Sequence, residues 1–172
     1  MSKHTPPRQL LIVWHSRTGA SEQLARAALE GAHAVLQELS AGGQVHPHLK
    51  TADETTAADL LAADAFLFCA PENLGSLSGA MKEFFDRNYY AVLDQLNGRP
   101  YGLLIAAGSD GSGAVRQVER ICTGWRLRAV APAQIINTDA QSAGAILAQK
   151  KLAKHQLEVG REMGGTLAAM LA

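Results

Sequence analysis

Cysteine is scarce in this chain, and the two residues that it has are isolated. Cys69 and Cys122 form no CxxC pair, and neither stands near histidines at the spacing of a zinc site. The sequence therefore predicts neither a disulfide nor a metal centre. This cysteine usage is typical of the reducing cytoplasm.

An excess of charge and long apolar runs are missing too. Sixteen Lys and Arg balance sixteen Asp and Glu, which disfavours binding to nucleic acid or to a charged membrane surface. No stretch of about 18 uncharged apolar residues is present, so we expect no membrane span. Residues 1–8 contain Pro6 and Pro7 and lack the apolar centre of a secretion signal. We expect them to form a flexible tail on a single cytoplasmic domain, residues 1–172.

What the chain does have is a regular alternation of apolar strands and amphipathic helices. The predicted strands are 9–14, 44–49, 65–70, 101–107 and 127–136, and Pro47 and Pro132 favour edge positions for the second and the last. The predicted helices are 21–39, 56–62 (capped by Asp53), 79–90, 114–122 and 145–171, the last with an interruption near Gly160 and Gly164. This alternation predicts an α/β fold, a five-stranded parallel sheet between two helical layers.

Glycine-bearing polar loops follow three of the predicted strands. They span residues 16–21, 71–78 and 108–113. Ligands of such sheets bind outside the carboxyl ends of the strands, so all three loops are expected at one edge of the sheet.

The first loop has the chemistry of a phosphate site. It consists of Ser16, Arg17, Thr18, Gly19, Ala20 and Ser21, and a predicted helix follows at once. Hydroxyl groups, backbone N–H groups and the positive end of the helix dipole all favour an anion. The Gly-Lys-Ser/Thr of a nucleotide triphosphatase and the Gly-x-Gly-x-x-Gly of a dinucleotide site are both absent. The alternative is an ordinary turn in which Ser21 only caps the helix.

The second and third loops suit the edges of a planar ring. The residues concerned are Pro71, Glu72, Asn73, Leu74, Gly75 and Ser76 in the second loop, and Gly108, Ser109, Asp110 and Gly111 in the third. They supply amide groups and short side chains that let a flat ligand approach. In the alternative interpretation, Ser78 and Asp110 simply begin the helices that follow.

These residues carry a resemblance to a known superfamily. The first loop resembles the T/S-x-T-G-x-T/S phosphate loop of flavodoxins. Residues 71–82 resemble the second flavin loop of flavodoxin-like NAD(P)H-dependent FMN and quinone reductases, with Ser78, Gly79, Lys82, Phe84 and Asp86 matching its S-G-x-x-K-x-F-x-D continuation. The resemblance implies a flavodoxin-like three-layer sandwich of strand order 2-1-3-4-5. It also implies non-covalent FMN held by the three loops, and a homodimer.

Two features favour a reductase over an electron carrier. Flavodoxins usually stack aromatic side chains on the ring, but residues 71–78 and 108–113 contain none, and the neutral charge is unlike that of the acidic flavodoxins. The resemblance then implies that NAD(P)H passes electrons through FMN to a quinone, a flavin or a similar small-molecule acceptor. No residue is assigned as catalytic, because this chemistry belongs to the flavin. The alternatives are a flavodoxin-type carrier and a flavin-binding module with a structural or sensory role.

Three further residues bear on the site. Cys122 and Arg128 have the C-x5-R spacing of tyrosine phosphatases, but Cys122 is expected to end a helix rather than to follow a strand. His15 stands at the end of the first strand. A polar strand terminus is the simpler interpretation of His15, and a contact near the phosphate is the alternative.

Overall fold

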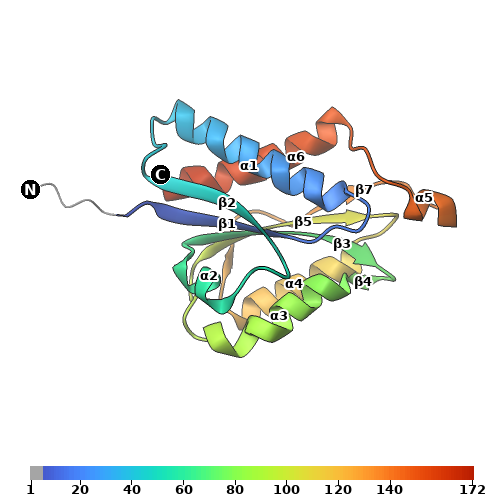
Figure 1. Ribbon diagram of the computed structural model, residues 1–172, viewed down its shortest axis with the longest axis horizontal. Helices are drawn as coiled ribbons and strands as arrows, with labels where there is room; N and C mark the ends of the chain where they lie inside the picture. Colours follow the sequence, from blue (N-terminus) through green and yellow to red (C-terminus); the bar gives the residue numbers. More distant parts are fainter. Residues whose placement is uncertain (1–5) are drawn as a thin grey trace, which may run out of the picture.

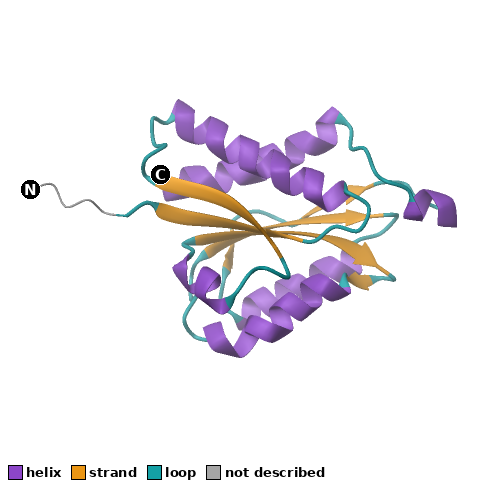
Figure 2. Cartoon of the chain, viewed as in Figure 1, coloured by secondary structure: helices purple, strands orange, loops and turns teal. Residues whose placement is uncertain are grey.

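The computed structural model describes residues 6–172 and has three layers (Figure 1). A mainly parallel sheet lies between two layers of helices, as Figure 2 shows. Two helices, α1 (Ala20–Glu38) and α6 (Lys154–Leu171), cover one face. The other face is covered by α2 (Ala57–Ala62), α3 (Gly79–Val92) and α4 (Ser112–Gly124). The short helix α5 (Ala143–Leu147) lies apart from both layers, beyond one end of the sheet.

The order of the main strands is as predicted. The strands are β1 (Arg8–Trp14), β2 (Val45–Thr51), β3 (Ala65–Asn73), β4 (Ser76–Leu77), β5 (Pro100–Ala107), β6 (Arg128–Ala129) and β7 (Gln134–Asn137). Parallel pairing gives the order β2-β1-β3-β5, and both β6 and β7 pair with β5 on its free side. The predicted count of five strands is too low, because the last strand is divided around Pro132 and β4 adds a short antiparallel partner to β3. Proline has no N–H to give to the sheet.

Both faces of β1 are buried, which explains why its sequence does not alternate. Leu10 and Ile12 face the α1–α6 layer, whereas Leu11 and Val13 face the other layer, and all four are fully buried. A central parallel strand covered on both sides needs apolar residues at every position.

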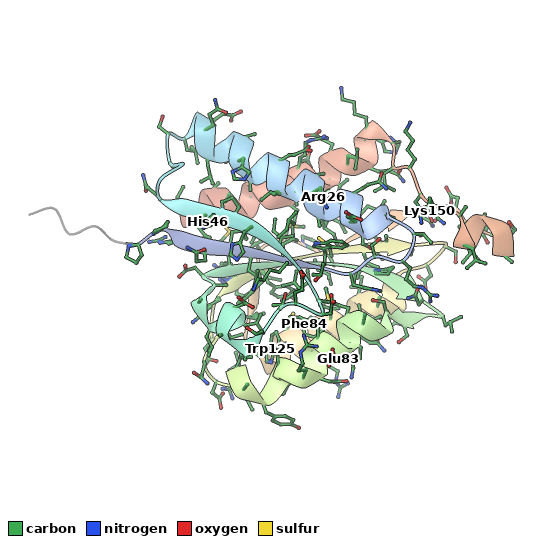
Figure 3. All side chains as sticks on the ribbon, in the orientation of Figure 1. Arg26, His46, Glu83, Phe84, Trp125 and Lys150 are labelled. Carbon is green, nitrogen blue, oxygen red and sulfur yellow. The ribbon has the colours of Figure 1, made fainter. Side chains whose placement is uncertain are left out.

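The two cores differ in the size of their side chains. Aromatic rings fill the side of α3 and α4, with Phe84 and Phe85 at a centroid distance of 4.9 Å and Phe68 and Phe85 at 5.2 Å. Trp125 is fully buried, and its ring lies 5.3 Å from that of Phe85. Figure 3 shows Trp125 and Phe84 on this side of the sheet. Cys122 lies within α4 and is buried with a free thiol, which agrees with its expected place on a helix.

The opposite core is aliphatic, and small residues form the close contact between α1 and α6 within it. A Cβ atom on Gly164 would overlap the backbone carbonyl of Ala28, and one on Gly31 would overlap the backbone of Arg161. These glycines let the two helices touch through their backbones. The predicted interruption near Gly160 and Gly164 is therefore wrong: α6 continues through both, because α1 occupies the space that a side chain would need.

Helix starts also differ from the prediction at two places. The last helix is divided into α5 and α6, and Gln156 helps to start α6 by accepting a hydrogen bond from the N–H of Ala153 at 2.9 Å. Helix α2 is capped by Thr56 rather than Asp53. The Thr56 Oγ1 atom accepts a hydrogen bond from the N–H of Asp59 at 3.3 Å, and the Asp59 carboxylate accepts one from the N–H of Thr56 at 2.8 Å, which completes a capping box.

The start of the chain is described from Pro6 onward. Most of the predicted tail, residues 1–5, lies outside the described residues, and β1 begins at Arg8, one residue earlier than expected. Within residues 6–172, no helix combines the length and the apolar character that crossing a bilayer requires.

The α1–α6 contact leads to the first prediction. Gly164→Ala should lower the free energy of unfolding by about 2–3 kcal/mol, because the added methyl group overlaps backbone that has no room to move. Gly79→Ala is the matched control, since a Cβ atom there meets nothing within 4 Å, and it should change stability by less than about 1 kcal/mol. Urea unfolding of the two variants measures both values. Equal stability of the two variants would contradict the packing argument.

Candidate functional site

A cleft of about 140 Å³ opens at the carboxyl edge of the sheet, where the three glycine-bearing loops meet. Its walls come from the ends of β3 and β5, from the start of α1 and from the chain after β7. Of the predicted residues, those that line the cleft are Ser16, Arg17, Thr18, Ala20, Ser21, Pro71, Glu72, Asn73 and Gly108. The predicted residues that do not line it are Gly19, Leu74, Gly75, Ser76, Ser109, Asp110 and Gly111.

The first loop makes a tight turn into α1. The Oγ atom of Ser16 accepts a hydrogen bond from the N–H of Gly19 at 3.0 Å. Gly19 has a φ of +89°, a left-handed conformation that favours glycine, and α1 begins at the next residue. The N–H groups of the first helical turn have no partners within the helix, so this turn presents donors to the cleft.

Ser21 is the residue of this loop that points most directly to a ligand. It is fully buried and lines the cleft, yet its Oγ atom has no hydrogen-bond partner among the described residues. A buried hydroxyl without a partner is costly and is rarely retained without reason. Ser21 does not act as the N-cap of α1, because that position belongs to Gly19. The interpretation of Ser21 as an ordinary cap is therefore wrong.

The second loop is a β-hairpin rather than an irregular loop. Strand β3 continues to Asn73, turns through Leu74 and Gly75, and returns as β4. Both turn residues have positive φ, +53° for Leu74 and +72° for Gly75. Positive φ at both central residues gives a turn whose twist matches that of the two flanking strands, as two-residue hairpins require. The Leu74 side chain is fully exposed at its tip.

Glu72 joins this hairpin to the third loop. Its carboxylate accepts hydrogen bonds from the N–H groups of Gly111 at 2.9 Å and Ala114 at 3.2 Å. A negative group at the start of α4 is favoured by the helix dipole. Gly113 allows the contact, since a Cβ atom there would overlap the backbone of Gly75. Gly113 is thus explained by packing against the hairpin, whereas a Cβ atom on Gly111 would meet the side chain of Ile135 in β7.

A fourth segment, which the sequence argument missed, closes the cleft. We call residues 138–153, between β7 and α6, the strap. Its lining residues are Thr138, Ala140, Ile146, Leu147 and Lys150. The rule that ligands bind at the carboxyl ends of parallel strands also applies to the strand before the strap. The strap was missed because the loop after this strand carries no glycine pattern like that of the other three.

Hydrogen bonds tie the strap to the loops at both ends. Near its start, the N–H of Ala140 donates to the carbonyl of Gly108 at 3.1 Å. Near its end, the N–H of Lys150 donates to the carbonyl of Thr18 at 2.7 Å. The strap therefore spans the cleft from the third loop to the first.

Gln23, also missed by the sequence argument, fastens the same junction from within α1. Its amide nitrogen donates to the carbonyls of Gly19 at 2.9 Å and Lys150 at 2.8 Å. Its amide oxygen accepts from the N–H of Leu152 at 3.1 Å. One side chain thus connects the first loop to the strap.

His15 lies beside the cleft but does not line it. Its Nδ1 atom is 2.9 Å from the Oγ atom of Ser78, at the start of α3. Burial lowers the pKa of His15 below its usual value, Arg17 lowers it further, and Asp53 opposes the shift. The imidazole is therefore neutral at neutral pH, and its contact is with Ser78.

The chemistry of the cleft fits the phosphate end of a mononucleotide. The free hydroxyl of Ser21, the first-turn N–H groups of α1 and the cations Arg17 and Lys150 all favour an anion. Within residues 6–172, no cluster of three or more His, Cys, Asp or Glu is arranged to hold a metal ion. The residues present therefore fit FMN at this edge of the sheet.

Comparison with known proteins agrees with this geometry. An archaeal flavodoxin superposes with a TM-score of 0.75 over 95% of this chain and 98% of its own, at 14% identity. A WrbA-like flavodoxin from Agrobacterium tumefaciens superposes with a TM-score of 0.70 over 95% of this chain and 97% of its own, at 18% identity. The protein therefore has the flavodoxin-like fold.

Sequence similarity identifies the family. The family described as NADPH-dependent FMN reductase matches residues 15–142, which include all three loops. The chain belongs to this family. It is 32% identical over 127 residues to a probable NAD(P)H dehydrogenase (quinone) FQR1-like 2 of Arabidopsis thaliana, covering 65% of this chain and 46% of that protein. It is 34% identical over 105 residues to a flavodoxin of Aquifex aeolicus, covering 61% of this chain and 51% of that protein. The matches thus span about half the length of these relatives.

The Glu72 contact leads to the second prediction. Glu72→Ala should lower the free energy of unfolding by about 1–2 kcal/mol, because it leaves the N–H groups of Gly111 and Ala114 without their acceptor. Glu83→Ala is the control: it removes an exposed carboxylate paired with Arg87 along α3, and should cost less than about 0.5 kcal/mol. Chemical denaturation measures both. If Glu72→Ala were as mild as Glu83→Ala, the carboxylate would not hold the hairpin to the third loop.

Proposed function

We propose that the protein binds FMN non-covalently in this cleft and acts as an NAD(P)H-dependent oxidoreductase. The observation that carries the proposal is the buried, unpartnered hydroxyl of Ser21 at the start of α1. In this proposal the first loop, Ser16 to Ser21, holds the phosphate. The hairpin residues Pro71 to Asn73 and Gly108 border the ring. The predicted residues that lie outside the cleft serve to shape its walls.

Bound FMN would supply the redox chemistry, taking a hydride from a nicotinamide and passing electrons to an acceptor. The protein's own residues bind and orient it. Ser21 and the N–H groups of α1 fix the phosphate end, and Glu72 holds the hairpin and third loop at a set separation. No side chain is assigned a proton-transfer role.

A reductase is favoured over a carrier by what lines the cleft. Among the described residues around it, none is Phe, Tyr or Trp. Most of the aromatic rings pack instead between the sheet and α3 and α4, whereas Trp14 packs against the α1–α6 core and Tyr90 is exposed. A ring face left uncovered by its own chain would be accessible to a nicotinamide and then to a quinone or flavin. The similarity to a flavodoxin supports the second candidate, an electron carrier without NAD(P)H activity.

We also propose a single domain that forms a homodimer in the cytoplasm. The dimer follows from the resemblance to flavodoxin-like reductases. The location is supported by Cys69 and Cys122, which are both buried free thiols, and burial raises the pKa of each. Unpaired, unreactive cysteines suit a reducing compartment.

Rapid mixing with reduced nicotinamides tests the proposed reaction. We expect the purified protein to be yellow and to release FMN on denaturation. Under anaerobic conditions, NADH or NADPH should bleach the flavin absorption at a rate of about 1 s⁻¹ or faster. A flavin that neither nucleotide reduces would favour the carrier. A colourless protein that does not bind added FMN would contradict both candidates.

Ser21 gives a prediction that separates a binding residue from a structural one. Ser21→Ala should weaken FMN binding about tenfold, because the phosphate loses a hydroxyl donor. The same change should leave the FMN-free protein equally stable or up to about 1 kcal/mol more stable, since it removes an unpartnered buried hydroxyl.

Thr166→Ala is the matched control for Ser21→Ala. The Thr166 hydroxyl already donates to the carbonyl of Glu162 at 2.8 Å and is exposed on α6. Its loss should leave FMN affinity unchanged. Flavin fluorescence titration and thermal unfolding without FMN supply the two measurements. Destabilisation by Ser21→Ala with no loss of affinity would contradict the proposed role.

A further inference from the structure

The strap carries a lysine into the wall of the cleft. Lys150 lines the cleft together with the first loop, and Figure 3 shows it between the start of α1 and α5. Its own backbone fixes its place, because its N–H donates to Thr18 and its carbonyl accepts from Gln23. The position of this side chain is therefore coupled to the first loop through two backbone groups.

The ammonium group of Lys150 is held by neutral partners. Nζ donates to the carbonyls of Ala145 at 2.7 Å, Ile146 at 3.0 Å and Ala148 at 2.6 Å. Lys150 takes part in none of the ion pairs found within residues 6–172. Carbonyl dipoles orient the ammonium without cancelling its charge, so the cation is fixed in place before any ligand arrives.

The charged side chains that line the cleft favour an anion. Arg17 and Lys150 are its two cations, and Glu72 is its only carboxylate among the described lining residues. The oxygens of Glu72 already accept hydrogen bonds from Gly111 and Ala114. A phosphate monoester carries a charge of about −1.5 to −2 at neutral pH, and it would supply the negative charge that balances the two cations.

We propose that Lys150 is the specificity-determining cation of the phosphate site, and that its charge makes the cleft select FMN over phosphate-free riboflavin. The inference rests on the proposed FMN site and adds to it a residue outside the three loops. The strap then has a definite task, which is to bring a positive charge to the first loop from the far end of the chain.

Charge and hydrogen bonding are separated by three variants. Lys150→Gln removes the charge but keeps an N–H donor for the carbonyls of α5. Lys150→Arg keeps the charge. Lys151→Gln is the matched control. It removes the same charge at the next residue, whose side chain does not line the cleft. Dissociation constants for FMN and for riboflavin are measured by fluorescence for each variant, with circular dichroism to verify folding.

A charge fixed at Lys150 should affect FMN and riboflavin differently. Lys150→Gln should weaken FMN binding about tenfold and riboflavin binding less than about twofold. Lys150→Arg should stay within about threefold of the wild type for FMN, and Lys151→Gln within about twofold for both ligands.

Three results would overturn the inference while leaving the proposed function intact. One is an equal loss of affinity for FMN and for riboflavin in Lys150→Gln, which would mean that Lys150 only holds the strap. Another is a loss of FMN affinity in Lys151→Gln as large as that in Lys150→Gln, which would mean that net charge alone matters. The third is equal affinity of the wild type for the two flavins. Failure of the wild type to bind either flavin would instead refute the proposed function, and the role of Lys150 with it.

A measurement on the wild-type protein decides the question if Lys150→Gln does not fold. FMN should protect the Lys150 amine from acetylation more strongly than riboflavin does, with Lys151 as the internal reference in the mass spectrum. Equal protection by the two flavins would mean that the ring merely covers the lysine, and would contradict the proposal.

Discussion

The backbone contact between α1 and α6 is the constraint on which the site depends. Gly31 and Gly164 allow the two helices to touch without intervening side chains. Because α6 is pressed against α1, the strap that precedes α6 must return to the start of α1. That start is also the first loop. The same packing that buries one face of the sheet therefore closes one side of the cleft.

Two polar side chains then set the spacing of the walls. Gln23 connects the first loop to the strap, and Glu72 connects the hairpin to the third loop. Each satisfies backbone groups at a place where a helix or strand ends and partners are missing. Against this background of satisfied groups, the unpartnered hydroxyl of Ser21 stands out, since it is the buried polar atom that the described residues leave for a ligand.

Local patterns predicted the sheet well and the end of the chain poorly. Apolar runs such as Leu10 to Val13 allow one interpretation, a strand buried on both faces, and the flavodoxin-like resemblance supplied the strand order that was found. The glycines of α6 were misjudged, because glycine weakens an isolated helix but here admits a neighbouring backbone. The aromatic core beside α3 and α4 and the glycine contact between α1 and α6 could not be predicted from single segments, because the side chains of each fit the element packed against them.

The sequence by itself determined the fold class and the edge of the sheet at which the loops gather, and it predicted a phosphate site at Ser16 to Ser21. These follow from periodicity and from residue chemistry within short segments. Only the tertiary structure decided which residues face the cleft. It assigned Glu72 to joining two loops, left Ser21 without a partner and brought Lys150 beside Thr18. Those outcomes depend on contacts between residues far apart in the chain, and such contacts exist only once the helices and loops have packed around the sheet.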